Sequence, residues 1–388
     1  MADDPAAGVR LSTVLKEWGR IGCIGFGGPP AHIALLRKLC VQDRKWLDDR
    51  EFEDAIAACN LLPGPASTQL AIFCAWRVRG RAGALVGGAA FVVPGLILIL
   101  ALAVLFLAGN PPVWVKGAGA GAGAAVAAVA VQAGTSLIPA SWRRAPPQSS
   151  SRLRWAMYLM AGAAAAATLG PWLVLVLIAG GLIEVIAQRV PAGRHPLAGL
   201  PALAAGGIAG GVLLSIAWVA VKVGALSYGG GFVIIPLMQS DAVDHYHWMT
   251  AAQFLNAVAL GQITPGPVVQ TVAVVGYAAA GLGGGVLASA VAFTPSFAFI
   301  LLGAHRFNQL RGNPRVRAFL DGAGPAAIGA ILGSALPLAT ALTQPWQYAV
   351  LAGAALLLVP LRRGVVLTLL SAAAVGVVAA LAGGPLPH

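Results

Sequence analysis

The tripeptide Pro63-Gly64-Pro65 recurs as Pro265-Gly266-Pro267, 202 residues later, and both copies lie inside apolar stretches of the chain. The same shift superposes Gly27-Gly28 on Gly229-Gly230 and holds without a gap from about residue 20 to about residue 92. Further superposed pairs are Gly22 with Gly224, Trp46 with Trp248 and Phe52 with Phe254. Helix breaks at corresponding places in two repeated halves are the main sequence indication of a secondary transporter's binding site. We therefore expect a duplicated, membrane-embedded transporter.

The composition supports this class of protein. Of 388 residues, 58% are hydrophobic and only 10% are charged, whereas about 25% charged residues is usual in soluble proteins. Several apolar runs, most clearly Ala82–Ala108, exceed the roughly 18 residues that a membrane-crossing helix needs. The sequence predicts an all-α, polytopic membrane protein whose main partner is the lipid bilayer.

The net charge of +12 does not indicate a nucleic-acid partner. The cations cluster in short loops between apolar segments, as the positive-inside rule expects, and they form no continuous basic face. The four cysteines (Cys23, Cys40, Cys59 and Cys74) lack metal-ligand spacing and are expected to serve packing. We expect no metal site, no cofactor and no enzymatic activity.

Loop charges predict that the two halves are inverted. Arg37–Arg50 contains five Lys or Arg residues, whereas the corresponding segment Gln239–Ala252 contains none and carries Asp241 and Asp244. Because cation-rich loops face the cytoplasm, homologous loops should lie on opposite sides of the membrane. The expected division is a first repeat at 1–190, a linker at 191–204 and an inverted second repeat at 205–388. The N-terminus is expected in the cytoplasm and the C-terminus in the periplasm.

The same rule predicts broken, re-entrant helices at the Pro-Gly-Pro motifs. If Phe52–Arg79 crossed the membrane, the cations after it would be left outside, so we expect a hairpin that returns to the cytoplasm at Trp76. Broken backbone at membrane depth persists only where it is buried in protein or lines a cavity. Both motifs should therefore face the protein interior near mid-membrane.

Two matched cations are candidate ligands for an anion. Arg20 and Lys222 stand at the same position before the two glycine motifs, and Lys222 is isolated in an otherwise apolar run. A lone cation inside the membrane is costly and indicates function. The alternative for both is that the long side chain extends to the membrane surface.

Backbone groups complete the expected anion site. Pro65 and Pro267 suit the first position of a helix, so the amides that follow, at Ala66–Gln69 and Val268–Thr271, would point unpaired at the cavity with the positive end of the helix dipole behind them. The alternative is that the motifs only kink packing helices. Asp54 is the better candidate for proton coupling, because Glu184 and Asp321 are expected at the membrane interface. His32 is either a cavity-lining donor or a helix-surface residue.

The motifs resemble those of the chromate ion transporter family. The resemblance rests on Gly25-Phe26-Gly27-Gly28-Pro29, Ala31-His32, Trp46 and Leu62-Pro63-Gly64-Pro65 with Gln69, and on Tyr228-Gly229-Gly230-Gly231 and Gln262-Ile263-Thr264-Pro265-Gly266-Pro267. It covers nearly the whole chain and implies a bacterial inner-membrane protein that exports chromate and confers chromate resistance, built from two homologous halves of opposite orientation. The family's usual Lys before the first glycine motif is Arg20 here, which leaves open whether the geometry of that side chain matters.

The expected substrate-binding residues combine the matched cations with the motif residues. They are Arg20, Phe26, Gly27, Gly28, His32, Asn60, Pro63, Gly64, Pro65, Gln69, Lys222, Tyr228, Gly229, Gly230, Gln262, Thr264, Pro265, Gly266, Pro267 and Gln270. Two cations and two helix N-termini suit a tetrahedral dianion. A dianion leaving a cell that is negative inside gains roughly 4.6 kcal/mol per 100 mV, so export needs no further coupling, although proton antiport stays open.

Other functions remain open at this stage. The same site could carry sulfate or another oxyanion, and sulfate would then compete with chromate. A channel or a non-transporting membrane component is the least favoured alternative. The sequence also leaves a homodimer open.

Overall fold

The computed structural model describes residues 8–60, 62, 64–145, 147–168, 173–188, 211–227, 233–303 and 313–387. In these ranges the chain is helical and contains no strand, which confirms the predicted all-α class. The expected linker at 191–204 lies outside the described residues, as do four candidate site residues: Pro63, Tyr228, Gly229 and Gly230.

The first half contains seven α-helices in its described part, with one π-helical segment after the second. They are α1 (Leu11–Ile24), α2 (Pro29–Arg37), the π-helix η1 (Lys38–Asp43), α3 (Asp49–Cys59), α4 (Ala66–Phe106), α5 (Val113–Arg144), α6 (Ser149–Thr168) and α7 (Leu173–Ala187).

The described part of the second half follows the same order. Its elements are α8 (Val212–Leu226), α9 (Ile234–Gln239), the π-helix η3 (Ser240–His245), α10 (Ala251–Ile263), the 3-10 turn η4 (Val268–Gln270), α11 (Thr271–Gly303), α13 (Pro314–Thr340), α14 (Pro345–Leu358) and α15 (Val365–Leu381). Four helical segments in the described ranges are long and apolar enough to cross a membrane: α4, α5, η4 with α11, and α13.

Local details repeat between the halves with the shift of 202. The π-helices η1 and η3 occupy corresponding residues, and Lys45 and His247, which also correspond, both have a φ of 51°. The caps correspond as well: Asp48 caps α3 and Thr250 caps α10, each by accepting a hydrogen bond from the third helical residue. The duplication therefore extends from the sequence to the backbone conformation.

Helix α4 is a hairpin of two antiparallel arms. The backbone leaves helical geometry at Arg79 and at Gly80, where φ is 61°. A Cβ atom on Gly87 would lie 2.4 Å from the Cβ of Ala75, and one on Gly88 would lie 2.9 Å from the side chain of Ile72. Such contacts are impossible in a straight helix, where these residues are about 18–24 Å apart.

Helix α11 bends in the same way at Ala280 and Gly281. The arm before each turn is about 20 Å long at 1.5 Å per residue, too short for a hydrocarbon core of about 30 Å. Each Pro-Gly-Pro motif is thus followed by a short arm that turns back. This confirms the predicted broken helices, with the first turn at Arg79–Gly80, slightly beyond the predicted Trp76.

The ungapped register predicted up to residue 92 is wrong beyond the Pro-Gly-Pro motifs. The two hairpin turns, at Gly80 and Gly281, are 201 residues apart. A shift of 201 also superposes Gln69 on Gln270 and Pro94 on Pro295. The second copy is therefore one residue shorter here, where η4 replaces the first α-helical turn.

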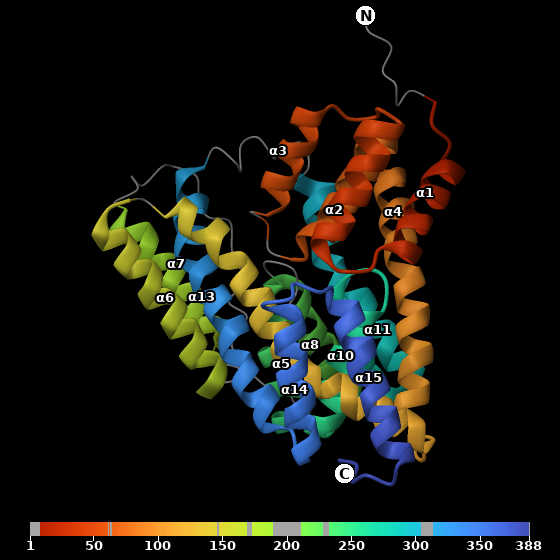
Figure 1. Cartoon of the computed structure of the whole chain (residues 1–388). Helices are drawn as coiled ribbons and strands as arrows, with labels where there is room; N and C mark the ends of the chain where they lie inside the picture. The colour runs from red at the N-terminus through yellow and green to blue at the C-terminus, as the bar shows by residue number, and fades with distance from the viewer. Residues whose placement is uncertain are drawn as a thin grey trace, which may run out of the picture.

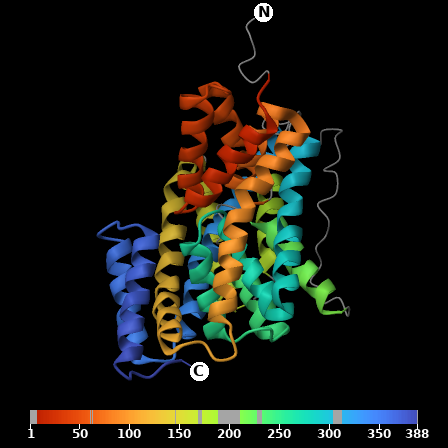
Figure 2. The ribbon, with the colours of Figure 1, turned by 90° about the vertical axis from the view of Figure 1, so that its right-hand side faces the viewer.

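The halves exchange their last helices. Helices α6 and α7 of the first half pack against α13 of the second half, and α14 and α15 of the second half pack against α5 of the first. Figure 1 shows α6, α7 and α13 together on one side of the molecule, and Figure 2 shows α14 and α15 beside α5 at the edge. The packing is close, since a Cβ atom on Gly121 of α5 would lie 2.1 Å from the carbonyl oxygen of Ala372 on α15. Small residues allow such approach between membrane helices.

The charged end of the first half is built from α1, α2 and α3, which lie at the top of Figure 1, whereas α15 ends at the bottom. Cations there are paired across elements: Arg37 with Asp49 and Glu53, Arg44 with Glu17, and Arg77 with Glu51. These exposed pairs hold the short helices together on the outer surface of this end.

Candidate functional site

The described parts of both Pro-Gly-Pro motifs are buried. Gly64 and Pro65 are buried in the first, and Pro265, Gly266 and Pro267 in the second. Gly64 has a φ of 117° and Gly266 a φ of 95°, a backbone conformation that side-chain-bearing residues rarely adopt. The glycine in each motif is therefore required by the turn itself.

The second motif is held by the first half of the chain. The N–H of Gly266 donates a hydrogen bond of 3.0 Å to the carbonyl oxygen of Gly25, in the first glycine motif. On its other side the motif packs against α4, where a Cβ atom on Gly95 would lie 2.3 Å from the carbonyl oxygen of Pro265. Only a glycine at position 95 allows this approach.

His32 reinforces the same junction. Its Nε2 lies 2.9 Å from the carbonyl oxygen of Gly25 and its Nδ1 lies 3.2 Å from the hydroxyl of Ser67. Since a carbonyl only accepts, Nε2 carries the proton and Nδ1 accepts from Ser67. His32 is fully buried and packs edge-on against Phe91. This burial excludes the predicted helix-surface position, and the cavity-lining role stays a prediction.

The first motif is held by the second half. A Cβ atom on Gly64 would lie 3.1 Å from the hydroxyl of Ser296 on α11 and 3.4 Å from the carbonyl oxygen of Gly224 on α8. Each described Pro-Gly-Pro segment therefore contacts the glycine-motif helix, or the turn after it, from the opposite half. This exchange places the candidate site at the junction of the halves.

The helix starts after the two motifs offer fewer free amides than predicted. Pro65 and Pro267 are N-caps rather than the predicted first helical residues, and the helices begin one residue later, at Ala66 and Val268. The amides of Thr68 and Gln69 donate to the carbonyl oxygen of Pro65, and that of Gln270 donates to Pro267. The Thr271 amide also bonds within the turn. Four amides remain for a ligand in the described chain: Ala66, Ser67, Val268 and Val269.

Several buried polar side chains near the motifs have no hydrogen-bond partner among the described residues. They are the Thr68 and Ser296 hydroxyls near the first motif, the Ser227 hydroxyl at the end of α8, and Nε2 of Gln262 just before the second motif. A buried donor without a partner costs about 1–3 kcal/mol, so such groups are rare in folded proteins. These four groups have hydrogen-bonding capacity that a polar ligand can use.

Gln69 and Gln270, which correspond under the shift of 201, are both fully buried. The Nε2 of Gln270 donates to the carbonyl oxygen of Val92 at 3.0 Å, and its Oε1 accepts from Ser289 at 3.0 Å. Its amide is thus engaged in bracing α4 against α11. Thr264 is also buried, and its hydroxyl donates to the carbonyl oxygen of Leu260.

Lys222 is not the isolated cation that the sequence suggested. Its Nζ lies 2.6 Å from Oδ2 and 2.7 Å from Oδ1 of Asp241, and both residues are buried. The Nζ also lies over the ring of Trp218, 5.7 Å from its centroid. The sequence analysis treated Asp241 as a loop residue, but it lies in η3 and its side chain is buried. Alignment of the two halves could have drawn attention to this residue, because Asp241 stands where the first half has the apolar Leu39.

Four predicted site residues are exposed and are not brought into this buried junction. Arg20, Phe26 and Asn60 are exposed, and Arg20 forms no ion pair within the described ranges. Gly27 is also exposed and Gly28 is half-buried, although a Cβ atom on Gly28 would lie 3.9 Å from Val268, just after the second motif.

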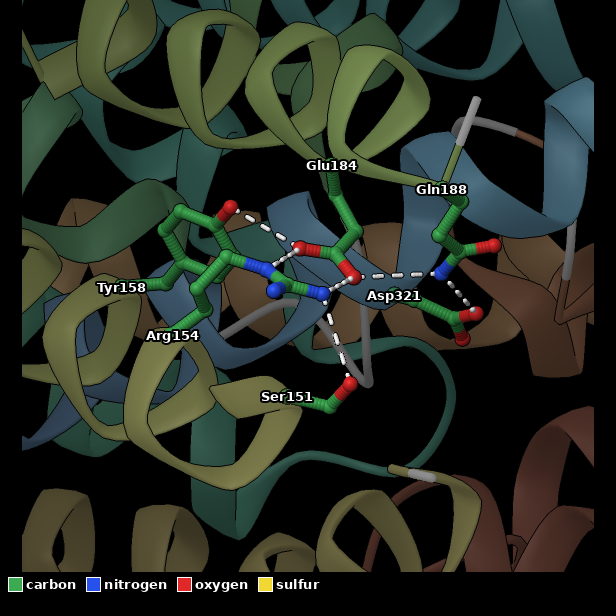
Figure 3. Close-up of polar contacts among 6 residues, drawn as sticks. All are labelled: Ser151, Arg154, Tyr158, Glu184, Gln188 and Asp321. Carbon is green, nitrogen blue, oxygen red and sulfur yellow. Dashed lines mark hydrogen bonds and ion pairs between the residues drawn. The ribbon is translucent and has the colours of Figure 1, made fainter. Parts of the chain in front are cut away.

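A second polar cluster, shown in Figure 3, lies where α6, α7 and α13 meet. Its members are Ser151, Arg154 and Tyr158 from α6, Glu184 from α7, Gln188 just after α7, and Asp321 from α13. Glu184 is buried and accepts two hydrogen bonds from Arg154, at 2.8 and 2.9 Å, and one each from Tyr158 and Gln188. Both carboxylate oxygens of Glu184 are thus satisfied, which is the pattern of a structural tie between helices.

Comparison with known proteins places the chain in a family. The family model for the chromate transporter matches residues 12–212 and 214–378. The chain is 33% identical over 339 residues to the chromate transport protein of Cupriavidus metallidurans, covering 85% of this chain and 82% of that protein. It is 28% identical to the probable chromate transport protein of Synechococcus elongatus (84% of each) and 29% identical to the chromate transport protein of Pseudomonas aeruginosa (82% and 79%). No solved structure matches it significantly. With the family model spanning both halves, including the two Pro-Gly-Pro motifs, this multi-pass membrane protein belongs to the chromate transporter family.

Proposed function

We propose that this protein is a secondary transporter that exports chromate across the bacterial inner membrane and thereby confers chromate resistance. Its binding site is formed at the junction of the halves by the two helix starts that follow the Pro-Gly-Pro motifs. The family supports chromate as the substrate, since the curated relatives described above are named for its transport.

The observation that carries the proposal is the pair of buried helix starts, each contacted by the opposite half. Free amides at a helix N-terminus, with the helix dipole behind them, form an anion site without any charged side chain. Ala66 and Ser67 supply such amides in one half, and Val268 and Val269 supply them in the other. The hydroxyls of Thr68 and Ser296 add donors that have no partner in the described chain.

The direction of transport follows from orientation and charge. We propose that the halves are inverted, with Arg37–Arg50 in the cytoplasm and Asp241–His247 outside. A membrane potential that is negative inside then drives a dianion outward.

Sulfate is the second candidate substrate. Amides, hydroxyls and one lysine recognise the charge and size of a tetrahedral oxyanion rather than its central atom. We therefore propose that sulfate competes with chromate at the same site.

The test is uptake of radiolabelled chromate into inside-out vesicles under an imposed potential, positive in the lumen. We expect saturable uptake that increases with the potential and is inhibited by sulfate. Ser296→Ala removes a donor beside Gly64 and should raise the half-saturating chromate concentration. Thr294→Val, which changes an exposed residue two positions earlier on the same helix, is the matched control and should not.

Uptake that does not saturate would indicate a channel. Equal effects of Ser296→Ala and Thr294→Val would place the site elsewhere. No uptake by the wild-type protein, in vesicles shown to contain it, would contradict the transporter function itself.

A further inference from the structure

The buried carboxylate of Asp241 is paired with Lys222, one of the two cations predicted to bind the anion. Lys222 is 9% exposed and Asp241 is 5% exposed. Both carboxylate oxygens lie within 2.7 Å of the Lys222 ammonium. In this state the two charges cancel, so Lys222 contributes no net positive charge to a ligand.

The location of the pair connects it with the first Pro-Gly-Pro motif. Lys222 lies on α8, two residues before Gly224, whose carbonyl oxygen is 3.4 Å from a Cβ position on Gly64. Ser227, with its buried unpartnered hydroxyl, follows at the end of the same helix. The ion pair therefore belongs to the helix whose C-terminal end approaches the first motif.

The pair exists in one half only. Under the shift of 202, Lys222 corresponds to Arg20 and Asp241 corresponds to Leu39. Arg20 is exposed and has no carboxylate partner among the described residues, whereas Leu39 is buried in the core. Within the described ranges the buried cation therefore has a counter-ion and the exposed one has none, so the pair is a feature of the second half alone.

Resting on the transport function proposed above, we propose that Asp241 is the proton-binding residue that couples anion binding to proton movement. In the empty transporter the Asp241 carboxylate holds Lys222. When an oxyanion binds, a proton from the adjacent aqueous compartment binds a carboxylate oxygen of Asp241, and the Lys222 ammonium is released to the anion. Anion release reverses both steps, so one proton accompanies each anion through the cycle.

The reason is electrostatic. A dianion cannot approach Lys222 closely while an ionised carboxylate lies 2.6 Å from the same ammonium, because like charges repel strongly in a buried site. Protonation of Asp241 removes this repulsion. By linkage, protonation and anion binding must then strengthen each other by the same factor.

Few other titratable groups face Asp241. Lys222 approaches from α8, and His245 follows one turn later on η3 itself, where it is exposed and stacks edge-on against Tyr246. Asp244, also on η3, is exposed. Neither α9 nor α10, which pack against η3, contains a titratable side chain. Asp241 is therefore the buried carboxyl in the described chain that can change charge beside Lys222.

The test is the pH dependence of chromate uptake in inside-out vesicles, with equal pH on both sides and a clamped potential. In the wild-type protein the half-saturating concentration should rise with pH, by up to about tenfold per pH unit once Asp241 is ionised in the empty state. Asp241→Asn removes this charge and should bind chromate more tightly at high pH, with the rise abolished. Asp244→Asn, on the same π-helix, is the matched control and should behave as the wild-type protein.

Chromate itself becomes protonated as pH falls, and this affects uptake by the wild-type protein and by both variants equally. The half-saturating concentrations of the three proteins are therefore compared at each pH. Inhibition by sulfate, which stays dianionic over this range, gives an independent measure. An Asp241→Asn variant with the wild-type pH profile would overturn the proposal.

A double variant keeps the test decisive if Asp241→Asn does not fold. Lys222→Gln with Asp241→Asn removes both charges, so no buried ion is left unpaired. We expect this variant to reach the membrane and to fail to transport chromate. Transport by it at the wild-type rate would show that the pair is structural. Failure of the wild-type protein to take up chromate would instead contradict the proposed function, so the two failures are distinguishable.

Discussion

The backbone amide of Gly266 donates a 3.0 Å hydrogen bond to the carbonyl oxygen of Gly25, which also lies 2.9 Å from His32 Nε2. One carbonyl oxygen in the first half thus positions both its own histidine and the second Pro-Gly-Pro turn. Any change that moves the first glycine motif should therefore be transmitted to the helix start after Pro267, in the other half.

Gly95 provides a direct test of this junction. Gly95→Ala would place a Cβ atom 2.3 Å from the carbonyl oxygen of Pro265, and overpacking of this kind costs roughly 1–3 kcal/mol. We expect a lower melting temperature in detergent and reduced chromate uptake. Gly353→Ala on α14, where a Cβ atom meets no atom within 4 Å, should leave both unchanged. Equal melting temperatures for the two variants would contradict this account of the junction.

His32 should make stability depend on pH. It lies in α2, which is too short to cross a membrane, and burial lowers its pKa from the ordinary value of 6.5, against a smaller opposing effect of the Gly25 hydrogen bond. The unfolded chain then binds the proton more readily than the folded one. The contribution of His32 is complete above pH 6.5 and is lost as pH falls below that value.

The measurement is the melting temperature of the wild-type protein and of His32→Gln between pH 8 and pH 5. The wild-type protein should lose more stability on acidification than the variant. His245→Gln, which changes an exposed histidine, is the control. A variant that loses as much stability as the wild-type protein would remove His32 from this role.

Lys222 and Asp241 should be strongly coupled in stability. Removing one partner of a buried ion pair leaves an uncompensated charge and typically costs about 3–5 kcal/mol, whereas removing both costs much less. We expect Lys222→Gln to lower the melting temperature and the added change Asp241→Asn to restore most of the loss. Independent, additive effects would mean that the contact is energetically unimportant.

Removal of the positive charge at Lys222 should reduce chromate export more than its removal at Arg20. Lys222→Gln is expected to abolish chromate export at normal expression, even when stability is restored by Asp241→Asn. Arg20→Lys should retain more export than Arg20→Gln if the exposed cation attracts the anion. Equal uptake by the two Arg20 variants would exclude that role.

The cluster in Figure 3 should affect stability but not substrate affinity. Glu184→Gln leaves Arg154 without its counter-ion, and because Arg154 is partly exposed we expect a loss of about 1–3 kcal/mol. The half-saturating chromate concentration of the folded protein should not change. Arg143→Gln, an exposed change at the end of α5, should affect neither quantity. A changed half-saturation in Glu184→Gln would connect the cluster with transport.

Sequence reasoning succeeded where the backbone is constrained by the residue type. Proline and glycine at residues 63–65 and 265–267 cannot continue a helix, so the breaks and the short returning arms were predictable. A single shift of 202 misaligns the two hairpin turns by one residue, because the second half lacks one residue after its Pro-Gly-Pro motif. Matching Pro94 with Pro295 would have revealed the deletion.

The Lys222–Asp241 contact was not predictable in the same way. The two residues are separated in the sequence by a glycine motif. Asp241 also stands between apolar residues and a polar turn, which is a usual place for a charged residue in an exposed loop. Whether such a side chain points outward or back toward α8 depends on how η3 packs, which no local pattern specifies. The exchange of α6–α7 and α14–α15 between halves was also missed, because alanine- and glycine-rich helices fit several partners equally well.

That exchange has a consequence for biogenesis. Helix α5 leaves the ribosome long before α15, yet its closest neighbours, at Gly117 and Gly121, are Gly376 and Ala372. Until the last stretch of the polypeptide is made, this face of α5 lacks the helix that packs against it in the folded protein. The packing of α5 is therefore completed only when the C-terminal helix has been synthesised.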